Sequence, residues 1–196
     1  MRRLCHSRSG SGAAEFALVL PLLILFIFGL IDAARFAWTW NRAEKAAQMG
    51  ARMAVVTDVI PGGLYTYDYV GVGGLTQGDV IPVGAFGSIT CNSVGCTPTA
   101  PSPPVGTFNS ASFNRIVARM QAFVPEIPAA NVTITYHGSG LGYAGDPNGM
   151  DIAPLVTVSI SSIPFPLFST LRIFGTSVTG ISATLTAEDS SGNVSN

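Results

Sequence analysis

The sequence predicts an α+β protein in which one long N-terminal helix carries a small head with an antiparallel sheet. Residues 16–31 form an uncharged, strongly apolar run, and no proline interrupts residues 32–56 after it. Later segments change period: residues 110–124 repeat like an amphipathic helix, and three segments after residue 130 alternate apolar and polar residues as half-buried strands do. We therefore expect a helix first and then a sheet of about three strands or more, with one helix packed on it and long loops rich in Gly and Pro.

The apolar run is long enough to cross a membrane with help from its flanks. Its 16 residues reach about 24 Å as a helix, against a hydrocarbon core of about 30 Å. The expected span is therefore about residues 14–34. Asp32 and Arg35 lie one helical turn apart at its end and can pair there. Three aromatic residues follow where an interfacial belt is expected, namely Phe36, Trp38 and Trp40.

Charge sets the expected orientation. Arg2, Arg3 and Arg8 precede the run, and no acid lies among the first eight residues. The positive-inside rule then predicts a cytoplasmic N-terminus and an extracytoplasmic head in a single-pass protein. Beyond residue 56 acidic residues outnumber basic ones, so this surface gives no reason to expect nucleic-acid binding.

Small residues recur every fourth position on the second half of the long helix. They form two rows: Ala43, Ala47 and Ala51, and beside them Ala46, Gly50 and Ala54. Such a seam lets another helix approach closely. The alternative is that the same stripe packs on the protein's own head.

The motif "GSGAAEF" places Gly10 five residues ahead of Glu15, which Phe16 follows. This arrangement resembles the G-x-x-x-x-E-[FY] processing site of type IVb pilins and pseudopilins. The wider segment, residues 9–55, resembles the N-terminal domain of TadE-like proteins, the minor pseudopilins of the tight-adherence (Tad/Flp) pilus system. The resemblance says much less about residues 57–196.

The resemblance implies a maturation step and an assembly role. A prepilin peptidase would cut between Gly10 and Ser11, removing a cytoplasmic leader (1–10) from a pilin-like helix (11–56) and an extracytoplasmic head (57–196). Glu15 would become the fifth mature residue and offer its carboxylate to a neighbour's amino terminus, because a paired charge in low dielectric costs far less than a lone one. Alternatively, Glu15 only solvates the end of an anchor at headgroup depth.

The implied partners are the peptidase, other pilins and pseudopilins, and the assembly platform of the bacterial inner membrane, with incorporation into a pilus left open. Subunit packing would involve Glu15 together with Ala43, Ala47 and Gly50.

The first part of the head reads mainly as loop, with short strand-like pieces at residues 65–70 and 85–90. A helix over residues 110–124 would have Ser110 or Ser112 as its cap and Pro125 as its stop. Its apolar face comprises Phe113, Ile116, Val117, Met120, Phe123 and Val124.

Three strands are expected at residues 131–137, 154–163 and 176–188. The inward face of the third changes at Gly180, which favours a bulge there. The apolar connection 164–174 is either a buried cap over the core or an exposed docking patch.

Cys91 and Cys96 frame the turn-like "CNSVGC" on the extracytoplasmic side, where a disulfide can persist. A metal site is the rival interpretation, but two cysteines without a nearby histidine supply only half of a zinc shell. Cys5 belongs to the leader.

Other motifs do not build an enzyme. "GLGYAG" fits a nucleotide-binding pattern but no helix follows it, and "HGSG" has no nucleophile elbow to pair with. His137 at a strand end is more typical of a structural residue. Asp146, Asn148 and Asp151 depart from calcium-loop spacing. We therefore expect no catalytic residue, cofactor or metal. The alternative function is an uncleaved, signal-anchored protein whose head binds a ligand or performs a hydrolysis.

Overall fold

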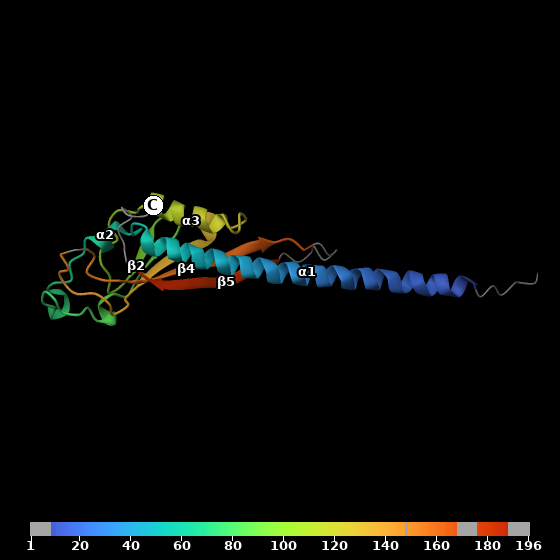
Figure 1. The fold of residues 1–196 in the computed structure, drawn as a ribbon, viewed down its shortest axis with the longest axis horizontal. Coiled ribbons are helices and arrows are strands. Elements are labelled where there is room, and N and C mark those ends of the chain that lie inside the picture. Colours follow the sequence, from blue (N-terminus) through green and yellow to red (C-terminus); the bar gives the residue numbers. More distant parts are fainter. Residues whose placement is uncertain (1–8, 148, 168–175, 188–196) are drawn as a thin grey trace, which may run out of the picture.

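One long helix, α1, organises the rest of the molecule. The computed structural model describes residues 9–147, 149–167 and 176–187. Helix α1 (Ser9–Val56) has 48 residues and continues through Pro21, which lies inside the helix. The second half of α1 lies along the head, and the first half extends away from the head alone (Figure 1). The expected long helix with a compact head is confirmed.

The head is built on a five-stranded, wholly antiparallel sheet in the order β2-β1-β3-β4-β5. The strands are β1 (Ser88–Cys91), β2 (Cys96–Thr99), β3 (Val132–His137), β4 (Leu155–Phe165) and β5 (Thr176–Thr186). The three strands expected after residue 130 are present. The expectation at residues 85–90 overlaps β1, whereas the one at residues 65–70 is wrong, because α2 (Gly62–Tyr65) ends there and no strand follows.

Helix α3 (Ser110–Gln121) packs beside α1, and α1 also contacts β4 and β5. The buried face of α3 includes Phe113, Ile116 and Met120, as the periodicity predicts. The cap is different from the expected serines: the Asn109 side chain accepts a hydrogen bond from Ser112 N at 3.0 Å. Asparagine is as good a cap as serine, so the error concerns one position and not the helix.

Gly180 marks a change of face without a change of register. The pairs Ile160–Ile181 and Ile163–Val178 belong to one uninterrupted antiparallel register, so no residue is inserted as a bulge would require. All four side chains are buried. Both strands thus switch their inward face at the same level, and Gly180 accommodates the switch with φ of +74°, where other residues are strained.

The loops at the end of the head away from the free part of α1 carry short helical turns, η1 (Val72–Gly74) and η2 (Val83–Ala85); η3 (Ala129–Asn131) leads into β3. Asp151 ties two of these loops together. Its carboxylate accepts backbone hydrogen bonds from Tyr69 and Gly145 at 2.8 Å and from Asp146 at 3.0 Å. The buried acid therefore satisfies backbone amides that would otherwise lack partners.

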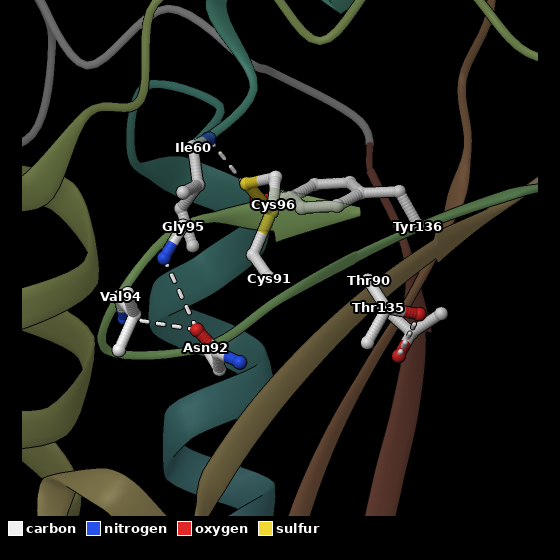
Figure 2. Close-up of a disulfide and its surroundings, with 9 residues drawn as sticks. All are labelled: Ile60, Thr90, Cys91, Asn92, Val94, Gly95, Cys96, Thr135 and Tyr136. Carbon is white, nitrogen blue, oxygen red and sulfur yellow. Dashed lines mark hydrogen bonds between the residues drawn. A yellow bond between two sulfur atoms is a disulfide. The ribbon is translucent and has the colours of Figure 1, made fainter. Parts of the chain in front are cut away.

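A disulfide joins Cys91 to Cys96 across the turn between β1 and β2 (Figure 2). Within that turn the Asn92 side chain accepts hydrogen bonds from Val94 N at 2.9 Å and Gly95 N at 3.1 Å. The turn is thus held both covalently and by an Asn side chain suited to turns.

Candidate assembly site on the N-terminal helix

The first half of α1 is an apolar surface that the head leaves uncovered. The helix from Gly12 to Val56 contains an 18-residue window of mean hydropathy 2.6, none of which is buried. Leu18 is 80% exposed and Leu22 is 74% exposed. By length and composition this segment can cross a membrane, which fits a single-pass membrane protein.

The expected processing residues all lie at the start of this surface. Gly10 and Ser11 are in the first turn of α1, because the helix begins at Ser9. Glu15 and Phe16 follow on the next turn, and both side chains are exposed. Backbone amides of a first helical turn have no intrahelical acceptor, so the Gly10–Ser11 bond lies where unwinding a helix costs least.

The alanine seam lies against the head of the same chain. Ala43, Ala47 and Gly50 are buried inside the chain, and the two alanines have no exposed surface. They pack in the core of the head with the rest of the stripe. This burial favours the alternative that the stripe packs on the protein's own head, and contact of these residues with a neighbouring subunit stays a prediction. Glu15 is therefore the only one of the four expected packing residues that remains on the surface.

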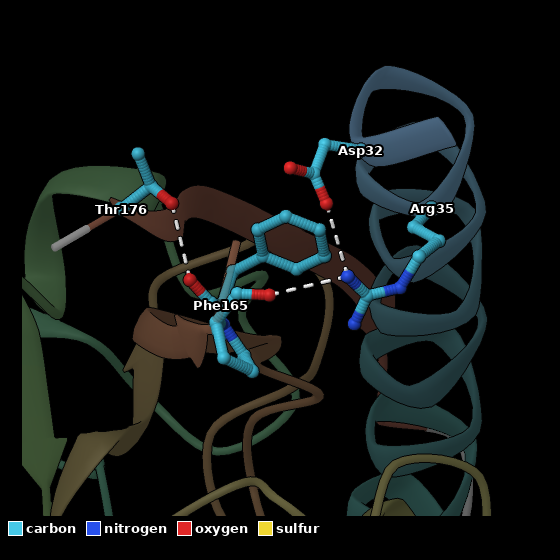
Figure 3. Close-up of polar contacts among 5 residues, drawn as sticks. Asp32, Arg35, Phe165 and Thr176 are labelled. Carbon is cyan, nitrogen blue, oxygen red and sulfur yellow. Dashed lines mark hydrogen bonds and ion pairs between the residues drawn. The ribbon is translucent and has the colours of Figure 1, made fainter. Parts of the chain in front are cut away.

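Arg35 connects α1 to the head where the apolar surface ends, and it also pairs with Asp32 of the same helix. Arg35 Nη1 donates to Asp32 Oδ1 at 3.1 Å and to the carbonyl oxygen of Pro166 at 3.2 Å. The guanidinium also lies over the Phe165 ring, 5.2 Å from its centre (Figure 3). Asp32 is only 5% exposed, so its partner is essential: an unpaired buried carboxylate would cost several kcal/mol.

The three aromatic residues expected to form an interfacial belt do not share one environment. Phe36 packs edge to face on Phe165 with ring centres 5.5 Å apart, and Trp40 is half-buried beside it. These two rings therefore belong to the contact with the head and do not form a lipid-facing belt. Trp38 alone of the three is well exposed, at 63%, and the Arg42 guanidinium stacks on it at 4.8 Å.

The candidate residues of the head are not gathered into a metal site in the part of the chain that the structure describes. No group of three or more His, Cys, Asp or Glu side chains is placed to hold a metal ion within the described residues. Asp151 is engaged by backbone amides, His137 is exposed at the end of β3, and Asn148 lies outside the described residues. The "GLGYAG" segment is a loop, bridged through Gly142 to Ile152.

A shallow groove of about 480 Å³ lies between the loops at the far end of the head, lined by Tyr65, Tyr67, Asp68, Gln77 and Asp146 among others. Most of the apolar connection 164–174 lies outside the described residues, so both of its interpretations stay open; Phe165, at its start, is buried.

Comparison with known protein families finds one match, and it falls on α1. Residues 10–52 match the family model described as TadE-like protein. The match confirms the resemblance over a segment that includes Gly10, Glu15 and most of the alanine seam, and the matching family is a pilus-related structural family and not an enzyme family. No curated protein and no solved structure matches the chain.

The sequence did not predict which residues of the head contact the arginines of α1. Phe165 and Pro166 meet Arg35 across 131 positions of sequence, and Arg42 Nε reaches the carbonyl oxygen of Phe123 at 3.0 Å across 81. No local pattern encodes contacts at such separations. The only local hint is that the first two basic residues after the apolar run, Arg35 and Arg42, are both arginines.

Proposed function

We propose that the protein is a structural and assembly component of a bacterial Tad-type adhesion pilus, a minor pseudopilin of the TadE-like class and not an enzyme. It is anchored once in the inner membrane, with a cytoplasmic leader of residues 1–10 and a periplasmic head of residues 57–196. The mature helix, residues 11–56, includes a membrane segment at about 14–34. Its partners are a prepilin peptidase, other pilins and pseudopilins, and the assembly platform.

One observation carries this proposal: the apolar half of α1 is uncovered and begins with the processing motif. A pure anchor needs apolar residues but not a carboxylate at its entrance, since an ionised side chain at membrane depth is costly. Glu15 is exposed there, five positions after Gly10, and the TadE-like match covers both residues. The carboxylate has a physical use if a neighbouring subunit's new amino terminus pairs with it.

Because the seam is buried, fewer residues of α1 remain available for packing between subunits. Because Ala43, Ala47 and Gly50 are buried against the head, packing between subunits would use the half of α1 before Asp32. Within that half, side chains such as Phe16 and Leu18 are available, and Glu15 sets the axial register.

Cleavage is the decisive experiment. In cells that contain a prepilin peptidase, N-terminal sequencing of the membrane-extracted protein should give Ser11 as the first residue. Gly10→Leu should leave a full-length chain, because a branched side chain blocks access to the scissile backbone. Gly29→Leu is the matched control: it is the same substitution on the same helix, at a position with no neighbouring atoms, and cleavage should be normal.

An intact Met1 in the native protein would refute processing and favour the alternative, an uncleaved signal-anchored protein. In that case the groove between Tyr65, Tyr67 and Asp146 would be the first place to seek a bound ligand.

A further inference from the structure

A pocket of about 220 Å³ lies between α1 and the head, close to the point where α1 leaves the head. Its helical wall consists of Arg35, Trp38, Thr39 and Arg42. The opposite wall is Glu126 together with residues 163–166 at the end of β4. The helical residues are spaced i, i+3, i+4 and i+7, so they form one stripe along the helix.

The depth of this stripe matches the headgroup layer of a bilayer. If residues 14–34 span the hydrocarbon, Arg35 lies at its boundary and Trp38 about 6 Å beyond it, at about 1.5 Å per residue. The polar layer on each side of a bilayer is about 5–7 Å thick. Arg42 is one turn further on, but its guanidinium lies over the Trp38 ring at 4.8 Å, so its charge sits near the level of Trp38.

Arg42 has hydrogen-bond donors for which no described residue provides an acceptor. Its Nε and Nη2 both donate to the carbonyl oxygen of Phe123. A guanidinium has five N–H donors, so three remain without a partner among the described residues. No carboxylate of the described chain pairs with it, since the ion pair of this region joins Arg35 to Asp32. A half-buried cation of this kind suits a phosphate, which accepts several N–H bonds at once.

Glu126 gives the same pocket an anionic side. Its carboxylate is exposed, lines the pocket opposite the arginines and forms no ion pair with a described residue. A site for a simple anion would gain nothing from a carboxylate. A ligand that carries a phosphate and, a few bonds away, a primary ammonium would use both sides. Ile163, Pro164 and Phe165 supply an apolar wall beside them.

We propose that this pocket binds the headgroup of a phosphatidylethanolamine-type phospholipid from the leaflet on the head's side. Arg42 donates to the lipid phosphate, Glu126 accepts from the ammonium, and the exposed Trp38 ring lies along the glycerol region. The lipid thereby fixes the depth and rotation of α1 beneath the head. The inference rests on membrane insertion of α1, which the proposed function shares, but not on cleavage or on pilus assembly.

Native mass spectrometry of the full-length protein tests the site. The detergent-purified chain is given equal amounts of phosphatidylethanolamine and phosphatidylcholine with identical acyl chains, and the retained lipid is counted. The wild type should retain phosphatidylethanolamine several-fold better, because a quaternary ammonium cannot donate to Glu126. Glu126→Gln should bring this preference close to one. The residue is exposed, so the variant should fold, and a thermal melt checks this.

Arg42→Gln should lower the retention of both lipids about tenfold, through loss of charge-assisted hydrogen bonds. Arg52→Gln is the matched control, an exposed arginine of the same helix outside the pocket, and it should change neither value. Equal retention of the two lipids by the wild type would overturn the proposal. So would an Arg42→Gln protein that behaves like Arg52→Gln, or displacement of the lipid by inorganic phosphate.

Alkaline extraction of membranes separates this inference from the proposed function. A chain that resists extraction but retains no lipid selectively refutes the headgroup site alone. A chain that is extracted contradicts both the anchor and the site.

Discussion

Gly50 of α1 lies directly against Met120 of α3. A Cβ at residue 50 would meet the Cγ and Sδ atoms of Met120 at 2.8 Å and a methyl group of Val158 at 3.3 Å. Both partners are fully buried, so neither can turn away into solvent. The close approach of the two helices therefore depends on the missing side chain at residue 50.

We predict that Gly50→Ala lowers the free energy of unfolding of the head by about 1 kcal/mol. Alanine gains about 1 kcal/mol in helix propensity, but overpacking a filled core costs about 1–3 kcal/mol. Thermal melts in mild detergent, followed by circular dichroism, measure the difference. The penalty should disappear when Gly50→Ala is placed in a Met120→Ala background. A Gly50→Ala protein as stable as the wild type would mean that Met120 moves aside freely.

Asp151 should be more important for the loops than for any ligand. Asp151→Ala removes the acceptor of three backbone amides, and we expect a loss of about 2–3 kcal/mol. Asp151→Asn should cost less, because its side-chain oxygen can still accept. Hydrogen exchange at Tyr69 and Gly145 should accelerate in the alanine variant. Unchanged exchange at these amides would contradict the role.

Two buried tyrosines, Tyr69 and Tyr136, should make the folded head less stable at alkaline pH. Burial raises the pKa of the Tyr136 hydroxyl above its ordinary value, outweighing the hydrogen bond that Ile60 N donates to it at 3.3 Å. Burial, with the nearby Tyr67 and Asp151, also raises the pKa of Tyr69. An unfolded tyrosine ionises near pH 10 while the folded one does not. The stability contributed by each is thus complete below pH 10 and declines as the pH rises above it.

Tyrosine-to-phenylalanine variants separate the two hydroxyls. Tyr136→Phe should lose about 1 kcal/mol at pH 7, because the buried Ile60 N–H then lacks its acceptor. Tyr69→Phe should lose little or nothing, since its hydroxyl has no hydrogen-bond partner among the described residues. Each variant should show a weaker decline of stability above pH 10 than the wild type. Denaturant unfolding from pH 7 to pH 12 provides the comparison.

The disulfide should stabilise the head modestly. Closing so short a loop contributes about 2 kcal/mol in the chain-entropy model, and a Cys91→Ala, Cys96→Ala double variant should lose that amount. The non-reduced native protein should be lighter than the reduced protein by two hydrogen atoms. Free thiols at both positions in protein from its native compartment would contradict the bond and reopen the metal interpretation.

The sequence predicted the elements whose pattern is visible within a short segment of the chain. The apolar run, the period of α3 and the alternation in β3 and β4 each repeat within a few residues, and the Asp32–Arg35 pair is one helical turn apart. The edge strand β2 was missed because it contains Pro98, which argues against a strand, and because it is mostly exposed and so shows no alternation of apolar and polar residues.

Features that need a partner strand or a distant loop could not be read in this way. The phase change at Gly180 suggested a bulge, because one strand does not show that the facing strand changes phase at the same level. Likewise, the seam that includes Ala43 and Ala47 has the same sequence whether it meets a neighbour or the head. Only the folded chain distinguishes these cases.

Glu15→Gln tests the assembly role of the carboxylate. If Glu15 only solvates an anchor end, the substitution should leave insertion, cleavage and assembly unchanged, since a neutral amide is easier to place at membrane depth. If it receives a neighbour's amino terminus, cleavage should persist, but the buried ammonium would lose its partner and stable association should fail. The expected result is a processed, membrane-resident protein that no longer cross-links to pilus subunits or supports piliation. Glu44→Gln, the same change on the head-bound part of α1, should assemble normally. Normal piliation by processed Glu15→Gln protein would refute the pairing while leaving the TadE-like match intact.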